Sequence, residues 1–172
     1  CRVWLLYSQV AQIVARQEMD VALPARPEDV ETQLGTRFKA QPGQLRVFGR
    51  EEWFAPPASG SNPPDAMVVC PCTMGTLASI AAGLAGNLIE RAADVVIKEG
   101  RKLILVPRET PFSALHLENM LRLARMGVVI LPPNPGFYHH PQTVDDLVDF
   151  VVARILDQLA VPHALMARWG EM

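Results

Sequence analysis

Short runs rich in valine, isoleucine and leucine alternate along the chain with longer stretches in which apolar positions recur every three or four residues. The first pattern predicts buried strands and the second predicts amphipathic helices. The predicted strands cover residues 3–7, 45–48, 66–70, 102–106 and 128–131. The predicted helices cover residues 9–18, 27–38, 75–85, 87–99, 113–126 and 143–159. Proline-rich composition predicts loops at 55–64 and 132–142.

Residues at the ends of the predicted helices support these limits. Ser8 is a good N-cap, and Thr143 with Asp146 forms a capping box in which aspartate replaces the usual glutamate. The strands are apolar on both faces, which is typical of a parallel sheet covered by helices on each side. The sequence therefore predicts a three-layer α/β/α fold of the flavodoxin or Rossmann type. Ligands of such folds bind beyond the carboxyl ends of the strands.

Composition narrows the class of protein. The chain has 172 residues, which predicts a single domain over 1–172, with 49% hydrophobic and 20% charged residues. The net charge of −2 offers no basic excess for binding nucleic acid. No apolar run approaches the roughly 18 residues of a membrane span. Three cysteines are too few for a disulfide scaffold, which favours a reducing, cytoplasmic setting.

Polar residues follow two of the predicted strands. After residues 66–70 the chain reaches Thr73, Met74, Gly75 and Thr76 as a helix begins. Two hydroxyl groups, a glycine and free backbone N–H groups indicate either an anion site or simple N-capping. After residues 102–106 come Arg108 and Glu109. These two residues form either a structural ion pair or part of a ligand site, and their place at the edge of the sheet favours the ligand.

Three further features carry candidate chemistry. The loop after the last strand presents Tyr138, whereas the adjacent His139 and His140 lack the carboxylate partners of a metal site. Arg154 lies seven residues after Leu147, inside the apolar stripe of the last helix. A buried guanidinium there needs an anionic partner; alternatively the side chain reaches solvent along the helix. Arg91 and Lys98 are seven residues apart on one helix face, most simply a solvated one.

Several motifs together closely resemble the flavin prenyltransferases, the UbiX family. They are VVCPCTMGTL at 68–77, NLIERAADV at 87–95, LVPRETPFS at 105–113, HLENM at 116–120 and PGFY at 135–138. The resemblance covers essentially the whole chain. It implies a flavodoxin-like fold that binds reduced FMN as a substrate and needs no metal. Dimethylallyl phosphate alkylates the flavin at N5, and a fourth ring closes at C6.

The resemblance also implies partners and site residues. The product would serve a UbiD-type decarboxylase, including one in ubiquinone synthesis, and the enzyme would form a large homo-oligomer such as a dodecamer. FMN would be held by Ser8, Thr73, Met74, Gly75, Thr76 and Arg108. The prenyl phosphate would be held by Arg91, Lys98, Arg108, Tyr138 and Arg154. Glu18 and Glu109 would handle protons, and Trp53 and Trp169 would offer aromatic faces to cationic character in the allyl group.

The chain departs from the family pattern at its start. The family opens with a strand, a Thr-Gly-Ala-Ser-Gly-Ala type turn and a helix ahead of the segment that matches residues 3–7, and Gln9 stands where many members carry Lys or Arg. By resemblance the absent strand lies between residues 3–7 and 66–70. We therefore expect one of two arrangements. Another strand fills that gap, or the two segments pair directly and the phosphate site of FMN is malformed.

Two other functions fit parts of the sequence. The first is a related FMN-dependent decarboxylase that acts on peptidyl-cysteine, and the second is a non-catalytic flavin-binding protein. The segment 107–112 and Arg154 suit a second substrate that bears a phosphate, which favours prenyl transfer.

Overall fold

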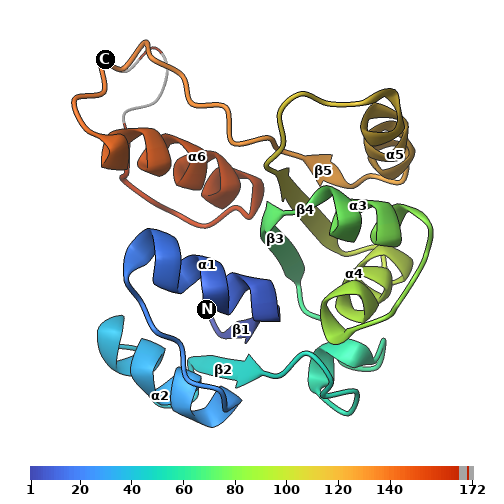
Figure 1. Ribbon diagram of the computed structural model, residues 1–172. Coiled ribbons are helices and arrows are strands. Elements are labelled where there is room, and N and C mark those ends of the chain that lie inside the picture. The colour runs from blue at the N-terminus through green and yellow to red at the C-terminus, as the bar shows by residue number, and fades with distance from the viewer. Residues whose placement is uncertain (167–169, 171–172) are drawn as a thin grey trace. The chain divides into compact units, whose positions relative to one another are not determined.

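The computed structural model describes residues 1–166 and 170, and it is an α/β protein in which every paired strand is parallel to its neighbour (Figure 1). The chain forms two compact units, one of residues 1–63 and 85–95 and the other of residues 64–84 and 96–172. The predicted α/β class with parallel strands is confirmed. The expectation of a single flavin-binding domain stays a prediction.

The first unit is built on a two-stranded sheet. β1 (Val3–Leu6) pairs with β2 (Leu45–Phe48) along its whole length. Two helices connect these strands, α1 (Gln9–Met19) and α2 (Pro27–Arg37), and α2 packs against β2. A small core of Phe48, Ala55 and Leu88 joins the sheet to the 3-10 turn Pro56–Ala58 and to the start of α4 (Leu88–Lys98).

The second unit is built on three parallel strands in the order β3 (Ala66–Cys72), β4 (Lys102–Pro107) and β5 (Val129–Ile130). α3 (Met74–Ala81) packs against β4 and α5 (Ala114–Arg125), and α5 also packs against β5. α6 (Val144–Gln158) covers the sheet through Ile155, which is buried with Ile104 and Val106. The carboxyl ends of the three strands lie at one edge, where the polar segments of the sequence follow them.

Most ends of the observed elements lie within one residue of the predicted ones, and three elements show differences with a structural reason. β3 runs two residues further than predicted, through the cis peptide bond between Cys70 and Pro71. α3 ends at Ala81 rather than at residue 85, because Gly83 takes a left-handed conformation with φ of 71° and turns the chain. β5 has only two residues, since its hydrogen bonds to β4 involve Ile104 and Leu105 alone.

One expected arrangement of the sheet is wrong. β1 pairs with β2, and β3 pairs with β4, so residues 3–7 and 66–70 do not pair directly within the part of the chain that the structure describes. Each of the two strands is paired along one edge, with a partner of its own unit. The alternative, a gap filled by another strand, stays a prediction. Among residues 1–166, no helix is both long and apolar enough to cross a bilayer.

Candidate functional site

The N-terminus of α3 is an open polar end directly after β3. Thr73 caps the helix, since its Oγ1 accepts a hydrogen bond from the backbone N–H of Thr76 at 3.2 Å and lies 3.1 Å from Thr76 Oγ1. The N-capping interpretation of Thr73 is therefore confirmed. The cap leaves the N–H groups of Met74 and Gly75 without an acceptor inside the helix. Together with the positive end of the helix dipole, they suit an anion.

Arg108 lies beside this helix end. Cys72 and Pro107 are partners in the register of β3 and β4, and the Arg108 backbone N–H donates to the Cys72 carbonyl at 3.3 Å. The Arg108 side chain is exposed and makes no ion pair with any residue that the structure describes. The unpaired Arg108 and the N-terminus of α3 thus both follow directly on the carboxyl ends of two adjacent strands.

This arrangement fits an anionic cofactor such as FMN. A Cβ at Gly75 would have Thr73 Oγ1 at 3.9 Å as its nearest neighbour, so the glycine leaves open space at the helix end. Thr73, Gly75, Thr76 and Arg108 are therefore brought together, as the sequence predicted for the flavin site. Met74 is the first residue of the same helix.

Glu109 is the next residue after Arg108. Its Oε1 accepts the backbone N–H of Thr110 at 3.1 Å, and its side chain is exposed. This bond holds one carboxylate oxygen and leaves the other free at the carboxyl edge of β4. An Arg108–Glu109 ion pair, the alternative to a ligand site, is not formed, which supports the ligand-site interpretation of the two residues.

Cys70 and Cys72, at the carboxyl end of β3, are poorly suited to act as nucleophiles or metal ligands. Burial, with a smaller contribution from Cys70, raises the pKa of the Cys72 thiol to about 12, and burial also raises the pKa of Cys70. Both groups are then neutral thiols near neutral pH, whereas a nucleophile or metal ligand needs the thiolate. No group of three or more metal-ligating side chains occurs within residues 1–166.

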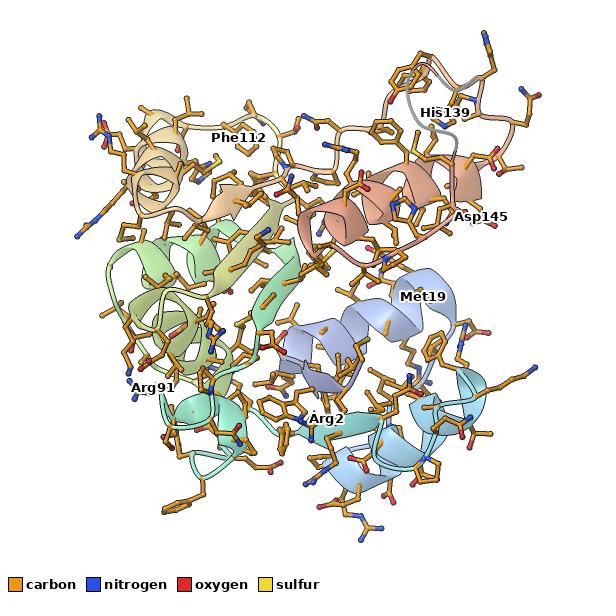
Figure 2. All side chains as sticks on the ribbon, turned by 180° about the vertical axis from the view of Figure 1, so that it is seen from behind. Arg2, Met19, Arg91, Phe112, His139 and Asp145 are labelled. Atoms are coloured by element: carbon orange, nitrogen blue, oxygen red, sulfur yellow. The ribbon has the colours of Figure 1, made fainter. Side chains whose placement is uncertain are left out.

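Tyr138 belongs to an aromatic cluster in the loop after β5. Its ring meets Phe150 of α6 edge-on at 5.9 Å and His139 at 5.8 Å, and His139 stacks on Phe150 at 5.5 Å. Figure 2 shows His139 in the loop beside the start of α6, where Asp145 lies. Because Phe150 is held by α6, the cluster fixes the Tyr138 ring against a rigid element.

Gly136 makes room for this cluster, and we predict that Gly136→Ala destabilises the protein. The new Cβ would lie 2.8 Å from Tyr138 Cε1 and 3.0 Å from Phe150 Cε2, so both rings would have to move. We expect a loss of about 1–3 kcal/mol, measured from the urea unfolding midpoint. Gly35→Ala is the control, because nothing lies within 4 Å of its Cβ position and alanine favours its helix. Equal midpoints for the two variants would contradict the crowding argument.

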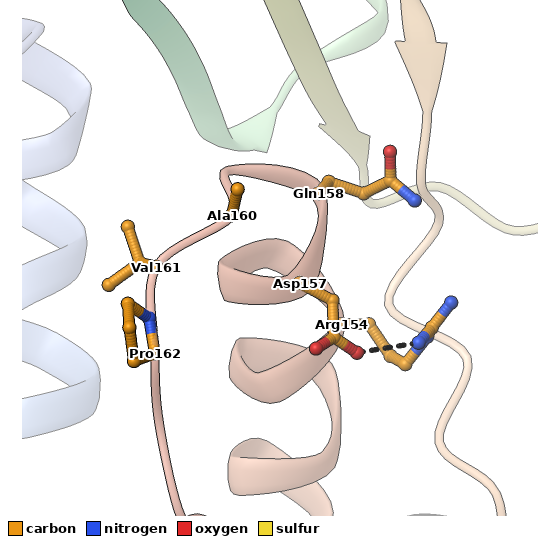
Figure 3. A pocket seen from close by; sticks show the side chains of 6 residues that line it. All are labelled: Arg154, Asp157, Gln158, Ala160, Val161 and Pro162. Carbon is orange, nitrogen blue, oxygen red and sulfur yellow. Dashed lines mark hydrogen bonds and ion pairs between the residues drawn. The ribbon is translucent and has the colours of Figure 1, made fainter.

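Arg154 is not buried in the apolar stripe, so of the two alternatives the one in which its side chain reaches solvent is confirmed. Its side chain is 51% exposed, and Nη1 pairs with Asp157 Oδ2 at 2.6 Å (Figure 3). The buried row of α6 runs through Val151, Ile155 and Leu159. Each step of four residues turns the row by about 40° around the helix, which carries it away from Arg154. Val144, the first residue of α6, is exposed as well.

Two open hollows meet at Arg154. One, of about 560 Å³, is lined by Arg154, Asp157, Gln158, Ala160, Val161 and Pro162 (Figure 3). The other, of about 310 Å³, is lined by Arg154, Phe150 and Val151 together with residues 129–132, Asn134 and Gln158. Phe150 thus touches Tyr138 on one side and shares a hollow with Arg154. The structure places these two predicted phosphate ligands around the same segment of α6.

Sequence reasoning missed Asp157 and His163. His163 Nε2 lies 3.1 Å from Asp157 Oδ1, and the backbone N–H of Leu165 donates to His163 Nδ1 at 3.4 Å. Because Nδ1 accepts, Nε2 carries the proton and donates to the carboxylate. Asp157 therefore joins Arg154 to the segment after α6. Its spacing of three residues from Arg154 was the signal available in the sequence.

The remaining predicted residues lie in the first unit or at its limit. Ser8 Oγ accepts the backbone N–H of Ala11 at 3.1 Å and so caps α1. Glu18 is exposed in the last turn of α1, and Trp53 is 43% exposed in the turn after β2. Their participation in one site with Thr73 and Arg108 stays a prediction. Trp169 lies outside the described residues.

Arg91 has a structural role in the first unit. Its Nε donates to the Ala58 carbonyl at 3.0 Å, and its Nη1 pairs with Asp94 at 2.9 Å. Figure 2 shows Arg91 beside the helical turn at residues 56–58. Lys98, the last residue of α4, pairs with Glu99 at 2.6 Å. Whether either residue binds the prenyl phosphate stays a prediction.

We predict that Arg91→Ala lowers stability by about 1–2 kcal/mol. The substitution removes the donor to a partly buried carbonyl and leaves Asp94 without its ion pair. The measurement is the chemical unfolding midpoint. Arg101→Ala is the control, since Arg101 is exposed and its side chain has no partner among the described residues. A midpoint shift no larger than that of Arg101→Ala would show that these contacts contribute nothing.

Comparison with known proteins decides the family. Residues 1–156 match the model of the flavoprotein family. The flavin prenyltransferase UbiX of Pseudomonas aeruginosa is 59% identical over 169 residues, which are 98% of this chain and 81% of that protein. The chain belongs to the UbiX flavin prenyltransferase family. Membership confirms the resemblance to this family. It also confirms the predicted enzyme class, which is a transferase that acts on FMN, and the prediction that FMN is the flavin.

Two solved structures of UbiX-like proteins share the fold closely. The dodecameric FMN-dependent UbiX-like decarboxylase from Escherichia coli O157:H7 is 45% identical with a TM-score of 0.84, over 98% of this chain and 83% of that one. AnUbiX (PadA1), in complex with FMN and dimethylallyl pyrophosphate, is 39% identical with a TM-score of 0.84, over 98% of this chain and 82% of that one.

The cysteine decarboxylases are more distant. TvaF, an FMN-dependent cysteine decarboxylase from thioviridamide biosynthesis, is 18% identical with a TM-score of 0.56, over 93% of this chain and 81% of that one. At this identity the likeness shows the fold alone. It gives the cysteine decarboxylase hypothesis no support beyond the shared architecture.

Proposed function

We propose that this chain transfers a dimethylallyl group from dimethylallyl phosphate to reduced FMN. The allylic carbon–oxygen bond breaks, phosphate leaves with the bonding electron pair, and the allyl carbon bonds to flavin N5, which loses its proton. A proton then adds to the double bond of the attached group, C6 bonds to the carbocation that results, and the hydrogen at C6 is lost as a proton, which gives prenylated FMN. The observation that carries the proposal is the meeting of the open α3 N-terminus with the unpaired Arg108 at the ends of β3 and β4.

The two anionic groups of this reaction need two sets of binding residues, and Arg108 belongs to both. Thr73, Met74, Gly75, Thr76 and Arg108 form the cluster at the α3 N-terminus, which we assign to FMN together with Ser8. Arg154 and Tyr138 lie around Phe150 and the adjoining hollow, and we assign them with Lys98, Arg91 and Arg108 to the prenyl phosphate. Cationic groups around the leaving phosphate stabilise the charge that develops on it.

In this proposal the carboxylates of Glu109 and Glu18 transfer the protons. Glu109 is held by the Thr110 N–H at the edge of β4, where it keeps one free oxygen. Glu18 is exposed, with no partner among the described residues. Either carboxylate can accept the proton lost at C6 or hold one at N5. Trp53 and Trp169 would stabilise cationic character in the allyl group through their ring faces.

The same proposal extends to partners. Prenylated FMN would pass to a UbiD-type decarboxylase, and the enzyme would work as a homo-oligomer, as the dodecameric relative does. The three cysteines are free thiols, which suits the reducing conditions of the cytoplasm.

The test is direct conversion of the flavin. The protein is incubated anaerobically with reduced FMN and dimethylallyl phosphate, and the flavin mass is measured after the reaction. We expect the mass of FMN to increase by one isoprene unit. Dimethylallyl alcohol is the control substrate, because it lacks the leaving phosphate and should leave the mass unchanged. An unshifted flavin mass with bound FMN and dimethylallyl phosphate would overturn the proposed function.

A further inference from the structure

The outer face of α5 carries apolar side chains that no residue described by the structure covers. Leu117 is 54% exposed and Leu121 is 51% exposed, although the inner face of the helix is well packed through Met120 and Leu123. α5 lies at the border of its sheet, beside α3 and β5 (Figure 1). Two leucines on one exposed helix face leave apolar surface in contact with water. A partner that covered them would gain the favourable free energy of burying that surface.

These leucines belong to a stripe with a symmetric order. The stripe reads Ala114, Leu117, Leu121 and Ala124, with steps of three, four and three residues along the helix, and all four residues are exposed. Such steps keep the residues on one helix face. The order small, large, large, small is the same in both directions. When two copies of the helix run antiparallel, each leucine meets a leucine and each alanine meets an alanine.

The charged residues beside the stripe are also arranged so that two antiparallel copies of α5 would be complementary. Glu118 lies in the N-terminal half of α5, and Arg122 and Arg125 lie in the C-terminal half. The structure gives none of the three an ion pair with any residue that it describes. An antiparallel pair places the acidic half of one helix beside the basic half of the other, and it also opposes the two helix dipoles.

We propose that the outer face of α5 binds the same face of a second copy of this chain about a two-fold axis. The seam of Ala114, Leu117, Leu121 and Ala124 is buried in this contact, and Glu118 of each copy lies by the arginines of the other. A two-fold contact needs one self-complementary surface, and both the stripe and the charges supply it. The inference assigns a contact to the proposed homo-oligomer and is independent of prenyl transfer.

The small area of one face of α5 limits how stable the contact between two copies can be. One helix face offers less than the roughly 800 Å² per partner that a standard stable interface buries. We therefore expect this contact to join subunits within a larger assembly and to depend on protein concentration.

The experiment gives the edge of α5 a single sign of charge in each of two variants and then mixes the variants. Glu118→Arg makes the outer edge of α5 wholly basic, and the double variant Arg122→Glu/Arg125→Glu makes it wholly acidic. Sedimentation velocity over a range of concentrations measures the assembly of each variant and of the wild type. We expect each variant alone to associate about tenfold more weakly, because like charges then meet twice across the axis. An equal mixture of the two variants should regain wild-type association, because opposite charges meet again.

Two controls keep the test decisive. Arg101→Glu changes an exposed, unpaired arginine outside α5 and should assemble as the wild type does. Leu117→Glu places a charge in the seam and should lower association more than either edge variant, with an unchanged circular dichroism spectrum. Wild-type association of Leu117→Glu, or a mixture no better than its two components, would overturn the proposal. Capture of a different protein by α5 with no self-association would also overturn it. Flavin conversion is assayed separately and tests only the proposed function.

Discussion

Glu109→Gln should leave FMN bound while product formation falls by about 10²–10⁴-fold. The Glu109 Oε1 atom accepts the Thr110 N–H, and a glutamine oxygen can accept the same bond, so the local backbone keeps its form. The substitution keeps the shape of the side chain and removes its negative charge and its ability to take or give a proton. A group that acts on protons in the transition state lowers turnover when it is lost, with little change in ground-state binding.

The measurement separates turnover from binding. Single-turnover formation of prenylated FMN is followed by mass spectrometry, and FMN affinity is followed by flavin fluorescence. Glu51→Gln is the control, because Glu51 is also exposed and lies outside the proposed site. Wild-type turnover in Glu109→Gln would remove Glu109 from the mechanism and leave Glu18 as the remaining candidate. Loss of FMN binding would instead give Glu109 a role in holding the flavin.

Features set by neighbouring residues were predictable from the sequence. Ser8, Thr73 and Thr143 cap the helices expected of them, and Asp146 completes its capping box. The backbone N–H groups of Gln142 and Thr143 donate to Asp146 and lower the pKa of its carboxyl. Such contacts span four residues or fewer, so composition and spacing reveal them. The strands were predictable for the same reason, since a buried parallel strand is a continuous apolar run.

Contacts between distant segments were not predictable in this way. Helical spacing put Arg154 in the stripe of Leu147, but the side of α6 that is buried depends on where the sheet meets the helix. Gly136, Tyr138 and Phe150 form one cluster across 14 residues, and no spacing rule joins a loop to a helix face. Family resemblance predicted the site residues, whereas only the structure showed which side chains lie against them.

Arg154→Ala should raise the KM for dimethylallyl phosphate by about 10–150-fold and leave FMN binding nearly unchanged. The loss of one charge-assisted contact to phosphate costs about 1.5–3 kcal/mol. Arg154 offers Nη1 to Asp157, and its other guanidinium nitrogens make no bond to a described residue. They remain available to a phosphate in the adjoining hollows. Arg154→Lys keeps the charge without the planar fork and should give a smaller loss.

Asp157 complicates the interpretation of that variant, and a second substitution resolves it. Removing Arg154 leaves the Asp157 carboxylate with His163, facing the space where the phosphate would bind. Part of the rise in KM would then come from repulsion by Asp157. In the double variant Arg154→Ala/Asp157→Asn this repulsion is gone, so its KM should fall between those of the wild type and Arg154→Ala. Asp145→Asn, on the first turn of α6, serves as the control for a lost carboxylate. If Arg154→Ala weakens FMN and dimethylallyl phosphate equally, the arginine stabilises the fold through Asp157 and does not bind the substrate.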